Sequence, residues 1–180
     1  MKSGYDPLQR KTNCSRWCGN ISVPFPFGLE DGCFARMEFQ LKCTNSTLLF
    51  TEDYYTQDGS YVNYINVNEG LMDIKYSINL NTSVDVSTDP GLYVTSRESM
   101  TQQQWAVAHL TCQEAQQKKT GYACASTNST CLRVNTSQGE YVGYRCKCMP
   151  GFDGNPYIAD GCKGTLCTSQ SPTTPPLCTS

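Results

Sequence analysis

Twelve cysteines in 180 residues constrain the fold of this chain more than any other feature. A cytosol keeps thiols reduced, whereas an even number of cysteines at this density is typical of a disulfide framework made in a secretory pathway. Ten of the cysteines fall into two groups, separated by residues 44–111, which contain none. We expect bridges among these ten: Cys14, Cys18, Cys33, Cys43, Cys112, Cys124, Cys131, Cys146, Cys148 and Cys162.

Six Asn-x-Ser/Thr sequons accompany the cysteines and indicate loops that carry glycan and face water. Their asparagines are Asn13, Asn20, Asn45, Asn81, Asn128 and Asn135. Cysteines and sequons together predict an extracellular protein. Residues 1–7 have no apolar stretch like that of a signal peptide, and no segment approaches the ~18 apolar residues of a membrane helix. We therefore expect a signal peptide to precede this chain and a membrane span to follow it in a longer protein.

The composition leaves limited material for a core, because only 38% of the residues are apolar. Cross-links offset this deficit, each contributing roughly 2–4 kcal/mol by restricting the unfolded chain. The net charge of −2 does not indicate nucleic acid or an anionic membrane as a partner.

The stretch without cysteines has the alternation of β-strands. Residues 38–42 and 61–67 alternate polar and apolar side chains, and residues 72–80 do so most strictly, with one polar face that fits a sheet wet on one side. Turn signals lie at 68–70 and 89–91.

Other segments show different patterns. Two prolines make residues 23–28 an extended or edge segment, in which we expect Phe25 and Phe27 to be core residues. Residues 105–110 and 114–119 are candidates for a short helix. Residues 164–180, rich in Ser, Thr and Pro, read as a disordered tail.

The first cysteine group carries a family resemblance. It runs Cys14-x3-Cys18-Gly19, an aliphatic stretch, Pro26-Phe27-Gly28, Gly32-Cys33 and then a strand ending in Cys43. This order resembles the galacturonan-binding domain of plant wall-associated receptor kinases, strongly over residues 14–43 and by pattern alone over 44–111. The residues themselves leave the pairing of these four cysteines open.

The second group resembles an EGF-like module, with Cys146-Lys147-Cys148, Gly151-Phe152 and a late Gly161-Cys162. Spacing alone does not choose among the possible pairings of its six cysteines. The resemblance implies that the bridges are Cys112–Cys131, Cys124–Cys146 and Cys148–Cys162. Cys112 lies at the boundary, so its membership of the first domain is an alternative.

Metal and catalytic chemistry find little support. The Cys-x-Cys motif is unlike the separated pairs of structural zinc sites, and Lys163 to Cys167 lack the carboxylates of a calcium-binding EGF module. No kinase signature and no Gly-x-Ser-x-Gly motif is present. His109, the single histidine, adjoins apolar residues and suits a packed or surface role. We expect no catalytic residues, no metal and no cofactor.

The family resemblance implies binding of galacturonan, which is an anionic chain of sugar rings, and not catalysis. Its recognition requires cations for the carboxylates and aromatic faces for the rings. In and beside the first cysteine group, the candidates are Arg16, Trp17, Arg36 and Lys42, although Trp17 also suits a core position. Tyrosines of the expected strands, Tyr61 and Tyr64 among them, are further stacking candidates, but strands favour tyrosine in any case.

The sequence thus predicts an all-β, disulfide-rich protein with three parts. These are a galacturonan-binding domain at 14–111, an EGF-like module at 112–163 and a disordered tail at 164–180. The resemblance implies non-catalytic binding of cell-wall pectin by a receptor ectodomain that faces the wall, with the kinase elsewhere in the full receptor. The alternative is a protein-interaction module that binds a peptide or co-receptor through its EGF-like part.

The first test concerns oxidation. Mass spectrometry of the secreted protein under non-reducing conditions should show five bridges among the ten cysteines from Cys14 to Cys162, because an oxidising compartment keeps such a framework closed. Free thiols throughout the folded protein would overturn the extracellular assignment.

Overall fold

The computed structural model describes residues 11–50, 60–75, 93–96, 102–118, 121–136, 138–165, 167–168 and 177–178. Among these, no helix is both long and apolar enough to span a membrane. The elements of the described residues are mostly β-strands and five disulfides join these residues, so the predicted all-β, disulfide-rich class is confirmed.

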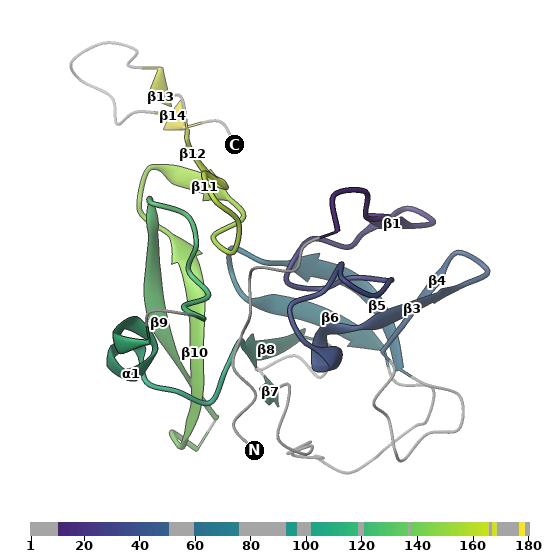
Figure 1. Cartoon of the computed structure of the whole chain (residues 1–180), viewed down its shortest axis with the longest axis horizontal. Helices are drawn as coiled ribbons and strands as arrows, with labels where there is room; N and C mark the ends of the chain where they lie inside the picture. Colours follow the sequence, from purple (N-terminus) through teal and green to yellow (C-terminus); the bar gives the residue numbers. More distant parts are fainter. Residues whose placement is uncertain are drawn as a thin grey trace.

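A six-stranded antiparallel sheet forms the larger layer (Figure 1). Its spatial order is β3 (Leu41–Thr44), β4 (Thr47–Phe50), β5 (Ser60–Asn66), β6 (Leu71–Lys75), β8 (Gln102–Ala106) and β7 (Tyr93–Ser96). The β3–β4 hairpin closes through Asn45 and Ser46, with φ angles of 51° and 62°. Two consecutive positive φ values are those of a type I′ turn, whose twist matches that of the strands.

Shorter elements surround this sheet. They are β1 (Trp17–Cys18), β2 (Ile21–Ser22), the 3₁₀ helix η1 (Met37–Phe39), the helix α1 (Cys112–Gln117), β9 (Ser129–Asn135), β10 (Tyr141–Cys148), β11 (Phe152–Gly154), β12 (Cys162–Gly164), β13 (Cys167–Thr168) and β14 (Leu177–Cys178). Pairs β1–β2, β9–β10, β11–β12 and β13–β14 are two-stranded ladders. Thr111 and Glu114 form a reciprocal capping box that begins α1.

Several strand predictions need adjustment. β5 confirms the strand expected at 61–67, and β6 forms the first part of the one expected at 72–80, whose remainder lies outside the described residues, as does the turn at 89–91. The strand expected from residue 38 is wrong at its start. There η1 buries Phe39 completely, and β3 begins at Leu41. Packing of that ring overrides the alternation.

The helix predicted from residue 105 is also wrong in its first half. Trp105 and Ala106 are the end of β8, and helix begins only at Cys112. In the predicted tail, Cys167–Thr168 pairs with Leu177–Cys178, and the described residues include nothing else beyond Thr165.

An aromatic cluster centred on Trp105 fills the core. Its ring is fully buried and meets Phe27, Phe39 and Tyr157 at centroid distances of 5.2, 5.8 and 5.3 Å. Phe27 and Phe39 meet each other edge to face at 5.1 Å. Phe25 is also buried, which confirms the prediction that Phe25 and Phe27 are core residues. Such aromatic contacts add roughly 0.5–1.5 kcal/mol per pair beyond the area they bury.

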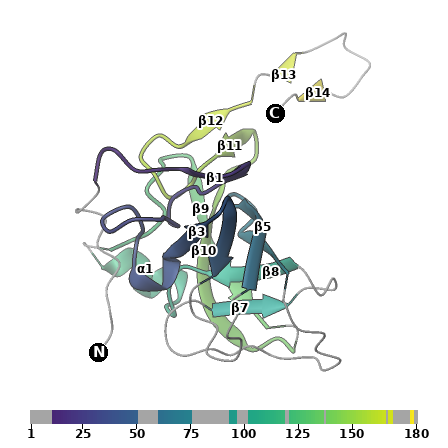
Figure 2. The same cartoon turned by 90° about the vertical axis from the view of Figure 1, so that its right-hand side faces the viewer.

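This core continues across residue 111, where the sequence suggested a domain boundary. The β9–β10 ribbon lies beside the end of β8 in both views (Figure 1, Figure 2). The Val107 N–H donates to the Tyr144 carbonyl at 2.7 Å, and the Tyr144 N–H donates to the Ala108 carbonyl at 3.1 Å. Asn155 Nδ2 donates to the Phe25 carbonyl at 2.7 Å, joining the C-terminal loop to the proline-rich segment. The two cysteine groups thus share one core.

Among the described residues, five disulfides close the framework. They are Cys14–Cys33, Cys18–Cys43, Cys112–Cys131, Cys124–Cys146 and Cys148–Cys162. Each lies within one cysteine group, and the last three are the pairs that the EGF-like resemblance implies. No bridge crosses residue 111 within the described part, so side-chain packing and hydrogen bonds join the two groups there.

The two tryptophans of the chain give a matched test of this shared core. Trp105→Ala should lower the free energy of unfolding by roughly 3–5 kcal/mol, because it removes a ring buried against both cysteine groups. Trp17→Ala should change it by less than about 0.5 kcal/mol, because Trp17 is 61% exposed. Denaturant titration followed by circular dichroism measures both. Two separate transitions, or equal effects of the two substitutions, would contradict a single shared core.

Candidate ligand-binding surface

The structure turns two of the four predicted ligand residues inward. Arg16 Nη1 donates to the Phe27 and Cys33 carbonyls at 2.9 and 3.2 Å. Arg36 Nη2 donates to the Val107 carbonyl at 2.8 Å, and its side chain is only 8% exposed. Both guanidinium groups therefore satisfy backbone carbonyls between segments distant in sequence.

The other two predicted residues face solvent. Trp17 is 61% exposed on β1, so the interpretation of Trp17 as a core residue is wrong. Lys42 is exposed on β3. Its ammonium group makes no hydrogen bond or ion pair with any residue that the structure describes.

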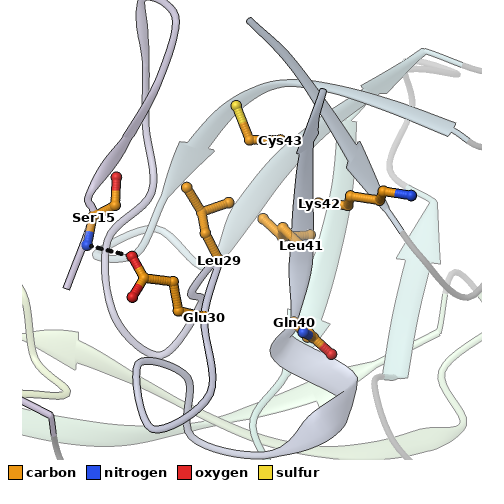
Figure 3. A pocket seen from close by; sticks show the side chains of 7 residues that line it. All are labelled: Ser15, Leu29, Glu30, Gln40, Leu41, Lys42 and Cys43. Carbon is orange, nitrogen blue, oxygen red and sulfur yellow. Dashed lines mark hydrogen bonds between the residues drawn. The ribbon is translucent and has the colours of Figure 1, made fainter. Parts of the chain in front are cut away.

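A hollow of about 460 Å³ lies between β3 and the loop before it. It is lined by Ser15, Leu29, Glu30, Gln40, Leu41, Lys42 and Cys43. Figure 3 shows that Leu41 points toward Leu29, whereas Lys42 leaves β3 on the opposite side. The hollow thus has an apolar wall, and the ammonium group of Lys42 lies outside it.

Glu30 makes the rim of this hollow acidic. Lys11 Nζ donates to its carboxylate at 2.6 Å and the Ser15 N–H at 3.3 Å. The hydrogen bond from Lys11 is the main cause that lowers the pKa of Glu30, with the Ser15 N–H adding to it. Glu30 therefore remains a carboxylate at neutral pH, which makes the hollow a poor place for an anionic sugar.

The outward face of the sheet offers a different surface. Strand register places Lys42 opposite Leu49, Leu49 opposite Tyr61 and Tyr61 opposite Lys75. Directly opposed residues of antiparallel strands share a face. These four side chains consequently form one row across β3, β4, β5 and β6, which we call the lysine–tyrosine row.

Burial confirms which way this row faces. Lys42 and Lys75 are exposed, and Leu49 and Tyr61 are half-buried. Residues of the opposite face are buried in the core: Leu41, Leu48, Val62, Met72 and Ile74. Lys75, like Lys42, has no hydrogen bond or ion pair with another described residue.

Two further side chains border the row. Tyr64, 56% exposed, lies opposite Asp73 in the adjoining pair of β5 and β6. Asp73 has one carboxylate oxygen shielded from solvent without a hydrogen bond among the described residues. Because Asp73 and Lys75 are two residues apart on β6, they share its outward face.

The sequence alone does not predict this row. The polar face of residues 73 and 75 was visible as alternation, and Tyr61 was a stacking candidate. The pairings of β3 with β4, of β4 with β5 and of β5 with β6 together place Lys42 and Lys75 in one row. No local pattern specifies the second pairing, because residues 51–59 separate β4 from β5.

The sequon asparagines within the described residues lie at or near the surface. Asn13, Asn20, Asn45 and Asn135 are exposed and Asn128 is half-buried, whereas Asn81 lies outside the described residues. Asn45 occupies the tip of the β3–β4 hairpin, three residues after Lys42 in the chain and to one side of the lysine–tyrosine row.

Comparison with known proteins identifies the region that contains this surface. The family described as wall-associated receptor kinase galacturonan-binding matches residues 14–76. Residues 14–76 are thus similar in sequence to the galacturonan-binding domain of that family. All four residues of the lysine–tyrosine row lie within these limits. The predicted resemblance to a wall-associated receptor kinase ectodomain is confirmed, and the EGF-like module remains a prediction.

Similar proteins occur in Arabidopsis thaliana. Wall-associated receptor kinase 5 is 41% identical over 67 residues, which are 37% of this chain and 8% of that protein. Wall-associated receptor kinase 3 is 25% identical over 146 residues, which are 81% of this chain and 17% of that protein. The chain thus matches less than a fifth of the length of these relatives. No solved structure matches it.

Stability measurements should separate the buried arginine from the exposed lysine. Arg36→Ala should lower the free energy of unfolding by about 1.5–3 kcal/mol, because it removes a charged donor from the Val107 carbonyl. Lys42→Ala should leave it within about 0.5 kcal/mol. Chemical denaturation of both variants measures the difference. Equal stabilities would mean that Arg36 does not support the fold as described.

Proposed function

We propose that this chain binds cell-wall galacturonan outside the cell, as the ligand-binding part of a receptor whose kinase lies elsewhere in the full protein. The observation that carries the proposal is the match of residues 14–76 to the galacturonan-binding family. The proposed role is non-covalent binding without catalysis. The proposed architecture is a galacturonan-binding domain with an EGF-like module packed against it.

Two exposed lysines of the domain suit contact with an anionic ligand, although acids outnumber bases within residues 14–76. Lys42 and Lys75 present ammonium groups that have no partner among the described residues. By contrast, Lys11 and Lys147 are already paired with Glu30 and Glu69, at 2.6 and 2.7 Å. Exposed unpaired ammonium groups lose no internal contact when they meet a ligand carboxylate. Trp17, Tyr61 and Tyr64 add solvent-accessible ring surface.

Esterification of the ligand provides the test. The oxidised, secreted chain should bind de-esterified polygalacturonate better than methyl-esterified pectin, because the ester removes the charge that lysine recognises. Binding should weaken as salt rises, since the Debye length falls from about 10 Å at 0.1 M to about 3 Å at 1 M. Glycan-array binding at several salt concentrations measures both effects.

The result also separates this proposal from a protein-binding function. No binding to either polymer, together with salt-insensitive capture of a peptide or co-receptor, would favour an interaction module. Equal binding of the esterified and de-esterified polymers would exclude recognition through charge.

A further inference from the structure

We propose that de-esterified galacturonan lies across the outward face of the six-stranded sheet, along the lysine–tyrosine row of Lys42, Leu49, Tyr61 and Lys75. This inference rests on the proposed function and names the surface that performs it. Of the four residues that the sequence predicted, the proposed site keeps Lys42, and it adds Leu49, Tyr61 and Lys75 of the strands that follow.

The spacing of the two lysines suits a polymer of carboxylates. Three strand-to-strand steps of roughly 4.8 Å separate β3 from β6, so the Lys42 and Lys75 Cα atoms lie about 14 Å apart. One carboxylate does not contact both ammonium groups across this distance. An extended oligomer does, and each contact then raises the effective concentration for the other.

The middle of the row is suited to sugar rings. Leu49 and Tyr61 lie between the lysines and are half-buried, so part of each side chain is packed in place before a ligand arrives. A preorganised tyrosine offers a large contact area with little loss of conformational entropy. The C–H faces of a sugar chain would pack on these side chains while its carboxylates reach the two ends.

Asp73 defines the limit of this surface on β6. Its carboxylate lies on the same face as the Lys75 ammonium group, two residues away, and opposite Tyr64. Two residues of a strand span roughly 7 Å, which is within a Debye length at physiological salt. Asp73 therefore repels an anionic chain from the adjoining pair and confines it to the lysine–tyrosine row. Removal of this charge should strengthen binding.

The hollow beside β3 is the competing location, and its chemistry disfavours it. Its rim carries the Glu30 carboxylate, its wall is Leu29 and Leu41, and the Lys42 side chain points away from it (Figure 3). The buried Arg36 is also unsuited, because ligand binding there would break its hydrogen bond to Val107.

The test compares two double substitutions that remove the same charge from the full chain. Lys42→Gln with Lys75→Gln should weaken binding to immobilised polygalacturonate by about tenfold, which corresponds to about 1.4 kcal/mol. The control, Lys118→Gln with Lys163→Gln, changes two exposed lysines at the end of α1 and on β12 and should stay within about twofold. Biolayer interferometry at fixed salt measures both, and thermal unfolding verifies that each variant is folded.

Three additional measurements sharpen the test. Lys42→Arg with Lys75→Arg should retain binding, because the charge remains. Asp73→Asn should strengthen binding about two- to threefold through the loss of repulsion at short range. Galacturonic acid monomer should compete poorly with polygalacturonate at equal carboxylate concentration, whereas an oligomer long enough to reach both lysines should compete well.

The outcomes separate the two levels of the proposal. If the wild-type chain does not bind polygalacturonate, the proposed function fails. If the wild type binds and the Lys42/Lys75 variant binds equally, the function stands and the lysine–tyrosine row is excluded. Equal losses in both double variants would show that net charge alone governs binding, which also overturns the row.

Discussion

The packing of Trp105 is the interaction on which the rest of the structure depends. Its ring contacts Phe27 of the proline-rich segment, Phe39 of η1 and Tyr157 of the C-terminal loop. Phe27 and Phe39 precede residue 111 and Tyr157 follows it, and no disulfide among the described residues crosses that position. Burial of this cluster covers one face of the six-stranded sheet, whereas Lys42 and Lys75 on the other face are exposed. The proposed galacturonan surface therefore lies on the face that carries these lysines, opposite the aromatic cluster.

The arginines and the lysines of this domain have different roles. Arginine has a planar group with several donors, which suits backbone carbonyls inside the protein, and Arg16 and Arg36 are used in that way. Lysine carries a compact charge on a flexible stem, and Lys42 and Lys75 project it into solvent from opposite ends of one row. The cations predicted near the first cysteines therefore include two arginines that support the fold and one lysine that is available to a ligand.

Particular residues show how far the sequence predicts this protein. Cysteine density and strand alternation were enough for the all-β, disulfide-rich class, because both are local signals. The resemblance implied the three C-terminal bridges, whereas spacing alone left them open, as it did the pairing of Cys14 with Cys33 and of Cys18 with Cys43. Residues 38–39 and 105–106 were misassigned because the burial of Phe39 and Trp105 depends on partners far away in the chain. The sequence likewise does not predict that Lys42 and Lys75 lie in one row, since this alignment results from three successive strand pairings.

Lysine footprinting of the complex tests the central claim most directly. The folded chain would be treated with an amine-reactive reagent, with and without a saturating de-esterified oligogalacturonate, and the modification of each lysine would be quantified by mass spectrometry. The lysine–tyrosine row predicts that the ligand protects Lys42 and Lys75 while Lys118 and Lys163 react at unchanged rates. Protection of Lys11 without protection of Lys42 and Lys75 would place the ligand beside the hollow instead. Binding that protects neither Lys42 nor Lys75 would contradict the account.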